Sequence, residues 1–440
     1  MAASARKVIL AVVVCLGMVA EISLHAPRGI TWSAPRYEMA PRPTQLLTHQ
    51  QYLLDENPTI HDVNITLQEE IPDDLKIEPA HGEDTTSLKK ILVWNDMYGK
   101  FHYGFGLGRE PFVRAGCRVD RCFVTADRRR FSVGELDALV WHFRSNDLSL
   151  PEVRSPHTRY VFRMQESPAY LYSSVQPYNG IFNWTFTYRL DSDFPSPHGF
   201  VLNRSPQPID AVSVTKNKTK LIAWFVSNCH SESGRESLAR TLQQFVDIDT
   251  YGRCGPLECR RSRQNECYAM LEQDYKFYLA FENSLCSDYV TEKFFSVLQY
   301  YVVPVVWGSA DYIKQGPRHS YVDARDFADV ESLARYLKYL DANDTAYMEY
   351  FSWKSDQQLA TGWSASARPW CDLCERLHSD PAPKYYDDLQ AWFVNGSACE
   401  SPLSRDLARF IHGETVTQRR DGEEEVVEGG GGRRRGRERR

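Results

Sequence analysis

The chain has 440 residues, enough for about two to three domains by the usual domain length. Its hydrophobic fraction of 42% and charged fraction of 25% are ordinary for a globular protein and argue against a largely disordered chain. The formal net charge of −6 gives no reason to expect nucleic acid as a partner.

The N-terminal segment 1–24 decides the expected compartment. Arg6 and Lys7 precede the apolar run Val8–Ala20, and Glu21 ends it. The run is short for a bilayer span, which needs roughly 17–25 residues, so a cleaved signal peptide and an uncleaved anchor both fit it. We favour the anchor because no small-x-small cleavage site follows. In both cases the rest of the chain enters the lumen.

Cysteines and glycosylation triplets favour the same compartment. Of the 11 cysteines, Cys15 lies in the apolar run, and the others are an even number that suits an oxidising lumen. Candidate Asn-x-Ser/Thr acceptors occur at Asn64, Asn183, Asn203, Asn217, Asn343 and Asn395.

Cysteine spacing suggests which bonds are local. Cys371 and Cys374 form a Cys-x2-Cys pair, which we interpret as a short disulfide, because no matching Cys/His pair of a zinc site lies nearby. Cys117 and Cys122 look like another local pair. Four of the remaining six are expected to pair among themselves, and two stay unassigned: Cys229, Cys254, Cys259 and Cys267, then Cys286 and Cys399.

The composition changes at Leu88. Residues 25–87 are rich in Pro, Gln, Asp, Glu and Thr with little apolar periodicity, which predicts a flexible stem. Strands are then predicted over 88–94, 139–143, 159–164, 220–226, 277–281 and 302–307, and helices over 233–245, 288–301 and 331–340. Strands alternating with helices predict βαβ units and an α/β fold with parallel sheets. Residues 421–440 combine an acidic run, four glycines and an arginine cluster, which predicts a disordered tail.

The segment Tyr275–Phe295 combines a strand, a polar turn and a helix start. Apolar residues recur at helical spacing after Asp288, so one side of this helix is expected to be anchored in a core. Glu292 and Lys293 fall on a different arc, near a helix N-terminus whose amides and dipole favour phosphate. On periodicity alone, solvated surface charges remain the simpler interpretation of both residues.

The same segment resembles the signature of the α1,3-fucosyltransferases, glycosyltransferase family 10. The matching residues are Phe-Tyr-Leu-Ala-Phe-Glu-Asn-Ser at 277–284 and Asp-Tyr-Val-Thr-Glu-Lys-Phe-Phe at 288–295. Further stretches resemble the family in the same order, at 165–168, 182–193, 223–229 and 371–374. Ser-Asn-Cys at 227–229 and Gly-Arg-Cys-Gly at 252–255 are most similar to the invertebrate and plant branch that modifies the N-glycan core.

The resemblance implies a GT-B fold, with two facing Rossmann-like domains behind the anchor and stem. The predicted limits are 1–24 for the cytosolic tip and anchor, 25–87 for the stem, 88–210 for the acceptor domain, 211–375 for the GDP-fucose-binding domain, 376–415 for a closing segment and 416–440 for the tail. It also implies a single-pass type II Golgi membrane protein with a lumenal catalytic domain.

The resemblance further implies inverting, metal-independent transfer of fucose from GDP-fucose, with no cofactor. Such a displacement needs a base for the acceptor hydroxyl and positive charge for the departing diphosphate. Glu166 matches the family's base, and His142 is the alternative. Expected donor-binding residues are Arg235, Asn283, Ser284, Tyr289, Glu292 and Lys293. Residues expected to shape the cleft floor are Trp184, Tyr188, Asp191, Asp193 and His198.

The acceptor stays open at this point, and two other function classes compete. The innermost GlcNAc of an N-glycan is the first choice, Lewis-type addition to a peripheral GlcNAc the second, and protein O-fucosylation ranks lower. Asp191-Ser-Asp193 has the Asp-x-Asp form of Mn²⁺-dependent GT-A enzymes, although the pattern recurs at Asp247-Ile-Asp249. A non-catalytic type II protein that binds glycans is the remaining alternative.

Overall fold

The computed structural model describes residues 69–401 and 405–412. All of these described residues belong to one compact unit. The expected anchor at 1–24, the stem up to residue 68 and the tail from residue 416 lie outside the described residues. Within the described part, no helix has both the length and the apolar character needed to cross a bilayer.

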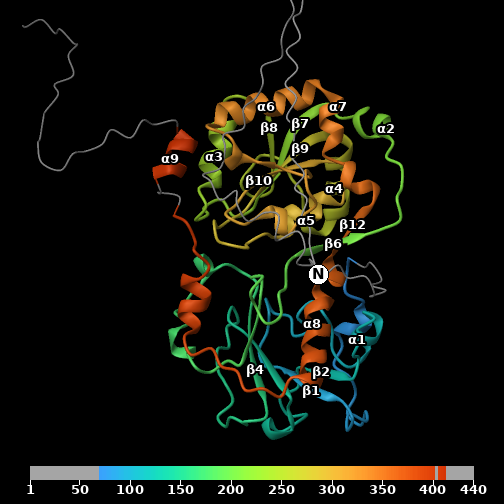
Figure 1. The fold of residues 1–440 in the computed structure, drawn as a ribbon, viewed down its shortest axis with the longest axis vertical. Helices are drawn as coiled ribbons and strands as arrows, with labels where there is room; N and C mark the ends of the chain where they lie inside the picture. Colours follow the sequence, from blue (N-terminus) through green and yellow to red (C-terminus); the bar gives the residue numbers. More distant parts are fainter. Residues whose placement is uncertain (1–68, 402–404, 413–440) are drawn as a thin grey trace, which may run out of the picture. The chain divides into compact units, whose positions relative to one another are not determined.

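A five-stranded parallel sheet, here called the first sheet, is built from the first half of the described chain in the order β2-β1-β3-β4-β5. Its strands are β1 (Lys89–Val93), β2 (Cys122–Thr125), β3 (Ala138–His142), β4 (Arg159–Met164) and β5 (Trp184–Thr187). Figure 1 labels β1, β2 and β4. Every residue of β2, β3 and β5 is buried, as in parallel sheets covered on both faces. The predicted strands correspond to β1, β3 and β4, whereas the four-residue β2 and β5 were not predicted.

The second sheet is also parallel and five-stranded, in the order β11-β10-β9-β7-β8. Its strands are β7 (Lys220–Phe225), β8 (Ile248–Tyr251), β9 (Tyr275–Phe281), β10 (Val303–Trp307) and β11 (Val322–Asp323). The helices that accompany it are α3 (Arg235–Leu242), α4 (Gln264–Asp274), α5 (Glu292–Leu298), α6 (Val330–Ala342) and α7 (Asp344–Glu349). Two parallel sheets of this kind confirm the predicted α/β fold of GT-B type.

The central strand β9 explains how helices cover both faces of the second sheet. Successive side chains of a strand point to opposite faces. Phe277 and Leu279 therefore join the core that contains α3 and α6, whereas Tyr278 and Ala280 join the core that contains α4 and α5. With all seven residues of β9 buried, the strand is held rigidly, and whatever follows Phe281 starts from a fixed position.

Two adjacent strands carry the chain between the sheets. β6 (Gly199–Asn203) leads from the first sheet toward the second, and β12 (Gln357–Thr361) leads back, paired antiparallel with it. The helix α8 (Gly362–Ser379) then packs beside β1, with its tryptophans in the core of the first sheet (Figure 1). The chain thus returns to the first sheet earlier than the domain limit near residue 375 that the sequence suggested. The remaining helices are α1 (Glu110–Arg114), α2 (Ala211–Thr215) and α9 (Arg405–His412).

The last part of the expected stem, residues 69–87, is packed against the first half of the chain. Leu75 lies in the core of the first sheet at 2% exposure, and its carbonyl accepts the amide of Leu107. Gly362 has φ +55, and a Cβ there would overlap the carbonyl oxygen of Glu69. The expectation of a flexible stem therefore does not hold for this part.

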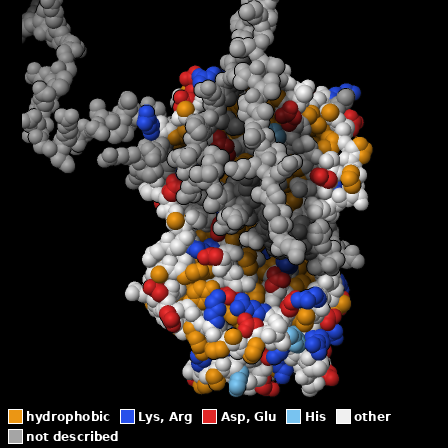
Figure 2. Space-filling view, in the orientation of Figure 1, with side chains coloured by type: hydrophobic (Ala, Val, Ile, Leu, Met, Phe, Trp, Pro, Cys, Tyr) orange, Lys and Arg blue, Asp and Glu red, His pale blue; other side chains and the backbone are white. Residues whose placement is uncertain are grey.

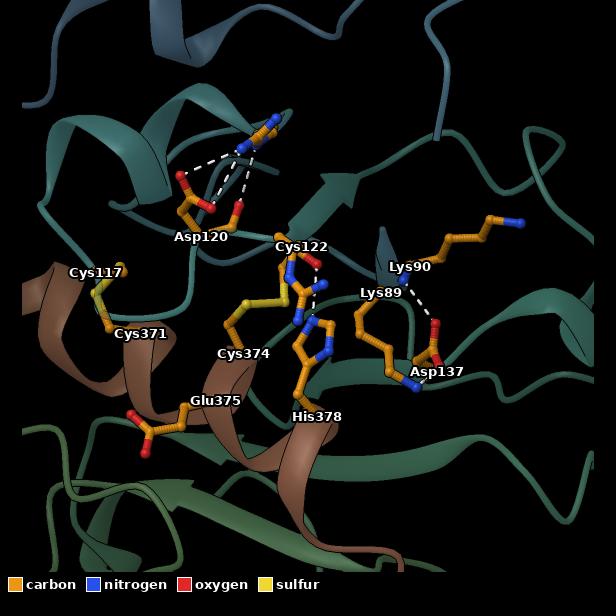
Figure 3. The surroundings of a disulfide bond; sticks show 12 residues. Lys89, Lys90, Cys117, Asp120, Cys122, Asp137, Cys371, Cys374, Glu375 and His378 are labelled. Carbon is orange, nitrogen blue, oxygen red and sulfur yellow. Dashed lines mark hydrogen bonds and ion pairs between the residues drawn. A yellow bond between two sulfur atoms is a disulfide. The ribbon is translucent and has the colours of Figure 1, made fainter. Parts of the chain in front are cut away.

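The structure corrects two cysteine predictions. Cys117 pairs with Cys371 and Cys122 with Cys374, so neither the Cys-x2-Cys bond nor the Cys117–Cys122 bond forms (Figure 3). Cys122–Cys374 attaches α8 to β2 of the first sheet, and Cys117–Cys371 attaches α8 to the loop before β2. A disulfide within one helical turn would constrain nothing, whereas these two join segments more than 250 residues apart.

The other cysteine predictions fare better. The four cysteines expected to bond among themselves do so, as Cys229–Cys254 and Cys259–Cys267. The two unassigned cysteines bond to each other, as Cys286–Cys399.

On the face shown in Figure 2, acidic and basic side chains of the described residues are interspersed, and no large area carries charge of one sign.

Candidate functional site

The turn between β9 and α5 carries several of the predicted donor-binding residues. Asp288 has φ +62, a left-handed conformation that cannot continue a right-handed helix, so α5 begins at Glu292 and not at Asp288 as predicted. The side chain of Asp288 accepts the amide of Leu190 at 3.1 Å. The later start places Glu292 and Lys293 in the first turn of the helix.

Glu282 is a buried carboxylate that the sequence analysis missed. Its side chain is fully buried and accepts the Thr291 amide at 2.8 Å, the Thr291 hydroxyl at 2.9 Å and the Lys293 ammonium at 3.1 Å. A buried carboxylate is tolerated when it is paired and hydrogen-bonded in this way. Its position directly after the apolar run Phe277–Phe281 was the available signal, because a charge there must find a partner.

Lys293 is the cation of this pair, with 20% of its side chain exposed. Desolvation acts to lower the pKa of Lys293, but the charges of Glu282 and Glu292 outweigh it and raise the pKa well above its usual value. Glu292 lies 3.5 Å from the ammonium and 3.9 Å from His198. The ammonium is therefore a permanent charge held at the end of β9.

Arg235 reaches the same strand end from α3. It is 3% exposed, and its guanidinium donates to the carbonyls of Phe281 and Asn228, each at 2.9 Å. Its Nε donates to Glu236 at 3.1 Å. Arg235 thus fastens the end of β9 to the loop after β7, and the structure brings the two expected cations to one strand end.

Asn283 and Ser284 join the two sheets. The Ser167 hydroxyl donates to Ser284 Oγ at 2.6 Å, and Tyr170 Oη donates to the Asn283 carbonyl at 3.4 Å. Ser167 follows β4 and Ser284 follows β9. The carboxyl ends of the two parallel sheets therefore meet, which is where such folds bind ligands.

Glu166 follows β4 at this meeting point, with 28% of its side chain exposed. Tyr289 Oη donates to one carboxylate oxygen at 2.9 Å. The other oxygen accepts Tyr98 Oη at 3.2 Å and lies 3.5 Å from the Arg144 guanidinium. Tyr289 is itself 2% exposed, so the structure aims its hydroxyl at the candidate base, not at open donor space.

His142, the alternative base, is fully buried within β3. Its Nδ1 lies 3.3 Å from the Asp96 carbonyl oxygen. Burial, followed by the charge of Arg163, lowers the pKa of His142 to about 3. His142 is 0% exposed and cannot reach an acceptor hydroxyl, whereas the Glu166 side chain is 28% exposed, which favours Glu166 as the base.

Most of the residues expected on the cleft floor pack in the cores around the first sheet or pair with neighbouring cations. Trp184 and Tyr188 are buried in its cores. Asp191 pairs with Arg189 at 2.7 Å. Asp193 is 3% exposed and binds Arg376 at 2.8 Å and Lys384 at 2.5 Å. Of the whole set, His198 is the residue that lies beside Glu292.

The two carboxylates of the Asp-x-Asp pattern therefore do not form a shared metal site, because separate cations neutralise them. Within the described residues, one group of side chains has the spacing of metal ligands, namely Cys122, Cys374 and His378. Its two sulfurs are joined in a disulfide and have no thiolate to offer a metal (Figure 3).

Two sequence profiles match most of the described chain. "Fucosyltransferase, N-terminal" covers residues 86–199, and "Glycosyltransferase family 10 (fucosyltransferase) C-term" covers residues 215–392. Together they span both sheets.

Individual proteins agree with the profiles. The chain is 39% identical over 354 residues to alpha-(1,3)-fucosyltransferase C of Drosophila melanogaster, covering 73% of this chain and 82% of that protein. It is 33% identical over 393 residues to glycoprotein 3-alpha-L-fucosyltransferase A of the same organism, covering 87% and 76%. A crystal structure described as an alpha1,3-fucosyltransferase with GDP-fucose is 16% identical, with a TM-score of 0.45 over 70% of this chain and 95% of that one.

Proposed function

Because the chain belongs to the fucosyltransferases of glycosyltransferase family 10, we propose that it transfers L-fucose from GDP-fucose in α1,3 linkage to the innermost GlcNAc of N-glycans. One observation carries this proposal. Glu166 after β4 and Lys293 after β9 lie at the joined carboxyl ends of the two sheets. Tyr289, in the segment 282–293 that we call the donor segment, donates a hydrogen bond to Glu166. A base and a fixed cation on opposite sides of one site are what an inverting displacement requires.

In the proposed mechanism the second sheet holds the donor. The Lys293 ammonium neutralises the diphosphate that departs with GDP, and Arg235 supports it from the same strand end. Glu292, with 59% of its side chain exposed, is available to accept hydrogen bonds from hydroxyls of the donor. Asn283 and Ser284 shape the turn beneath, where the sheets join.

The first sheet supplies the base. Glu166 takes the proton of the acceptor hydroxyl as that oxygen attacks the anomeric carbon, and GDP leaves from the opposite face. Hydrogen bonds to both carboxylate oxygens hold Glu166 in one orientation. Fixed orientation of the base is a large part of what such a site contributes to the rate.

The choice of the N-glycan core rests on two observations. One of the similar proteins is named a glycoprotein 3-alpha-L-fucosyltransferase. The two stretches that resemble the core-modifying branch, 227–229 and 252–255, are joined by the Cys229–Cys254 disulfide beside Arg235. Lewis-type addition to a peripheral GlcNAc is the second candidate.

A lumenal location is part of the proposal. The structure pairs ten cysteines in five disulfides, which suits an oxidising lumen. We infer a single-pass type II Golgi protein whose N-terminal apolar run is the membrane anchor, with an N-glycan or glycoprotein as acceptor.

The test uses the full-length chain with GDP-fucose and two acceptors, an agalactosylated N-glycan and N-acetyllactosamine. Transfer to the N-glycan core supports the proposal, and transfer to N-acetyllactosamine alone selects the Lewis-type alternative. Glu166→Gln is expected to keep GDP affinity and to lose turnover by about 10²–10⁴-fold, the usual contribution of a general base. Loss of transfer in EDTA with recovery in Mn²⁺ would overturn the metal-independent mechanism.

A further inference from the structure

Two exposed tyrosines lie near Glu166, and the proposed chemistry uses only the hydroxyl of one of them, Tyr98, and neither ring. Tyr172 is 80% exposed and Tyr98 is 51% exposed. Single exposed aromatics are common and need no explanation. These two, however, flank the same Arg144 guanidinium, which contacts the candidate base. We call Tyr98, Arg144 and Tyr172 the aromatic platform.

Tyr98 is held in place at a cost in backbone energy. Its φ is +55, a conformation that non-glycine residues rarely adopt. Asp96 maintains the turn, since it accepts the Gly99 amide at 2.6 Å and the Ser145 hydroxyl at 2.5 Å. Backbone strain that the surroundings enforce tends to occur at ligand sites. The turn therefore presents the Tyr98 ring in a fixed position.

Arg144 locks the platform together and to the base. Its guanidinium lies 4.6 Å from the ring centre of Tyr172 and 5.7 Å from that of Tyr98. It also donates to Tyr172 Oη and lies 3.5 Å from a Glu166 oxygen, with only 13% of its side chain exposed. Rings that are ordered before a ligand arrives lose little entropy on binding.

We propose that the aromatic platform binds the acceptor saccharide, with a pyranose ring stacked on Tyr172 and Tyr98 and its reacting hydroxyl directed to Glu166. A pyranose has an apolar face of C–H groups and a rim of hydroxyls. Tyrosine offers an apolar face with a polar tip, and Arg144 and Glu166 offer the hydrogen-bonding groups at the edge. The inference rests on the proposed function, because it takes Glu166 as the base.

The test measures acceptor binding separately from donor binding. Full-length chains with Tyr172→Ala and Tyr98→Ala are compared with Tyr172→Phe, which keeps the ring. Tyr339→Ala, an exposed tyrosine on α6, is the matched control. At saturating GDP-fucose, both Ala variants of the platform are expected to raise the KM for an agalactosylated N-glycan about tenfold, while Kd for GDP stays unchanged. Tyr98→Ala is expected to lower kcat as well, because it removes a hydrogen bond to Glu166, so Tyr172→Ala is the variant that tests the platform alone. Tyr172→Phe is expected to raise KM less than Tyr172→Ala.

A second readout does not depend on turnover. Ligand-observed NMR with the same free N-glycan and added GDP is expected to show binding to the wild-type chain and to Tyr339→Ala, and loss of binding to Tyr172→Ala. Equal glycan binding or an equal KM in all variants would overturn the platform. A wild-type chain that binds the glycan through Tyr172 but transfers no fucose would contradict the proposed function and leave the platform supported.

Discussion

At the residue scale, Tyr289 has the role that the structure changes most. The resemblance assigned it to the donor, and its position beside Glu292 and Lys293 supports that reading. The structure buries the ring against Tyr188, with centroids 5.0 Å apart, and directs the hydroxyl across to Glu166. Tyr289 is thus a residue of the donor segment that positions the candidate base.

Tyr289→Phe tests that role, because it removes the hydroxyl and keeps the ring packing. Glu166 then loses one of its two tyrosine hydrogen bonds, and we expect kcat to fall about 10–100-fold, as for loss of a well-oriented catalytic geometry. GDP affinity, measured by calorimetry, is expected to stay unchanged. A raised Kd for GDP with normal kcat would instead assign the hydroxyl to the donor.

Lys293 and Glu282 illustrate how a functional charge also carries stability. Lys293→Ala is expected to abolish GDP binding and, by leaving Glu282 buried without its cation, to lower the free energy of unfolding by about 3 kcal/mol. The double variant Lys293→Ala/Glu282→Gln should regain much of that stability, measured by denaturant unfolding, but not GDP binding. Recovery of both would show that Lys293 acts only on the fold.

The pH dependence of donor binding follows from the same pair. The pKa of Lys293 is raised in the folded chain, so its charge is complete below the usual lysine pKa and is lost only as pH rises through the higher folded value. GDP affinity is therefore expected to show no decline from deprotonation of Lys293 between pH 7 and about pH 9. A loss of affinity in that window that Lys293→Arg prevents would contradict this assignment.

At the element scale, two neighbouring disulfides hold α8 to β2 and to the loop before it. Cys117–Cys371 and Cys122–Cys374 span 254 and 252 residues, so each closes nearly the same long loop. Once one of the two bonds has formed, the other closes only a short additional loop, because Cys117 is close in sequence to Cys122 and Cys371 to Cys374. The chain entropy that the pair removes from the unfolded state is therefore shared between the two bonds.

A double-mutant cycle should reveal this redundancy. Replacing the cysteines of either bond by Ser is expected to cost about 2–3 kcal/mol, whereas removing both should cost about 3 kcal/mol more than the sum. Denaturant unfolding of the oxidised variants measures these differences. Removing Cys259–Cys267, which spans eight residues, is the comparison for an isolated short loop. Simple additivity at α8 would contradict the shared-loop explanation.

At the scale of the whole molecule, tertiary burial decides which glycosylation triplets are usable. Asn183 is 2% exposed, and its side chain bonds the Tyr160 amide at 2.8 Å and the Lys384 carbonyl at 2.9 Å. A glycan there would separate β4 from β5. Asn217, between α2 and β7, is exposed.

We therefore expect Asn183 to be unmodified and Asn217 to carry a glycan in the secreted or Golgi-resident chain. Glycopeptide mass spectrometry measures the occupancy of both sites. Asn217→Gln should remove one glycan without loss of folding. Asn183→Gln should reduce folding yield, since its hydrogen bonds organise the strand ends. Full occupancy at Asn183 would contradict the packing of this region.

Much of the fold was predictable from the sequence, because strand and helix periodicity are local properties. The strands β4, β7, β9 and β10 lie within a residue or two of their predicted limits. The strands β2, β5, β8 and β11 were missed, since two to four residues show too little periodicity, and β6 and β12 were missed as well. The start of α5 was misplaced because nothing local announces the left-handed Asp288.

The sequence by itself determined the α/β class, the family, and the residue types available for chemistry at the ends of β4 and β9. These depend on local residue patterns and on the amino-acid sequence of segments such as Tyr275–Phe295. Only the tertiary structure decided the partners: Glu282 with Lys293, Tyr289 with Glu166, the cysteines of α8 with those in and just before β2, and the tyrosines that flank Arg144. Contacts between residues so far apart in the chain depend on how the two sheets and α8 pack, and no local pattern encodes that packing.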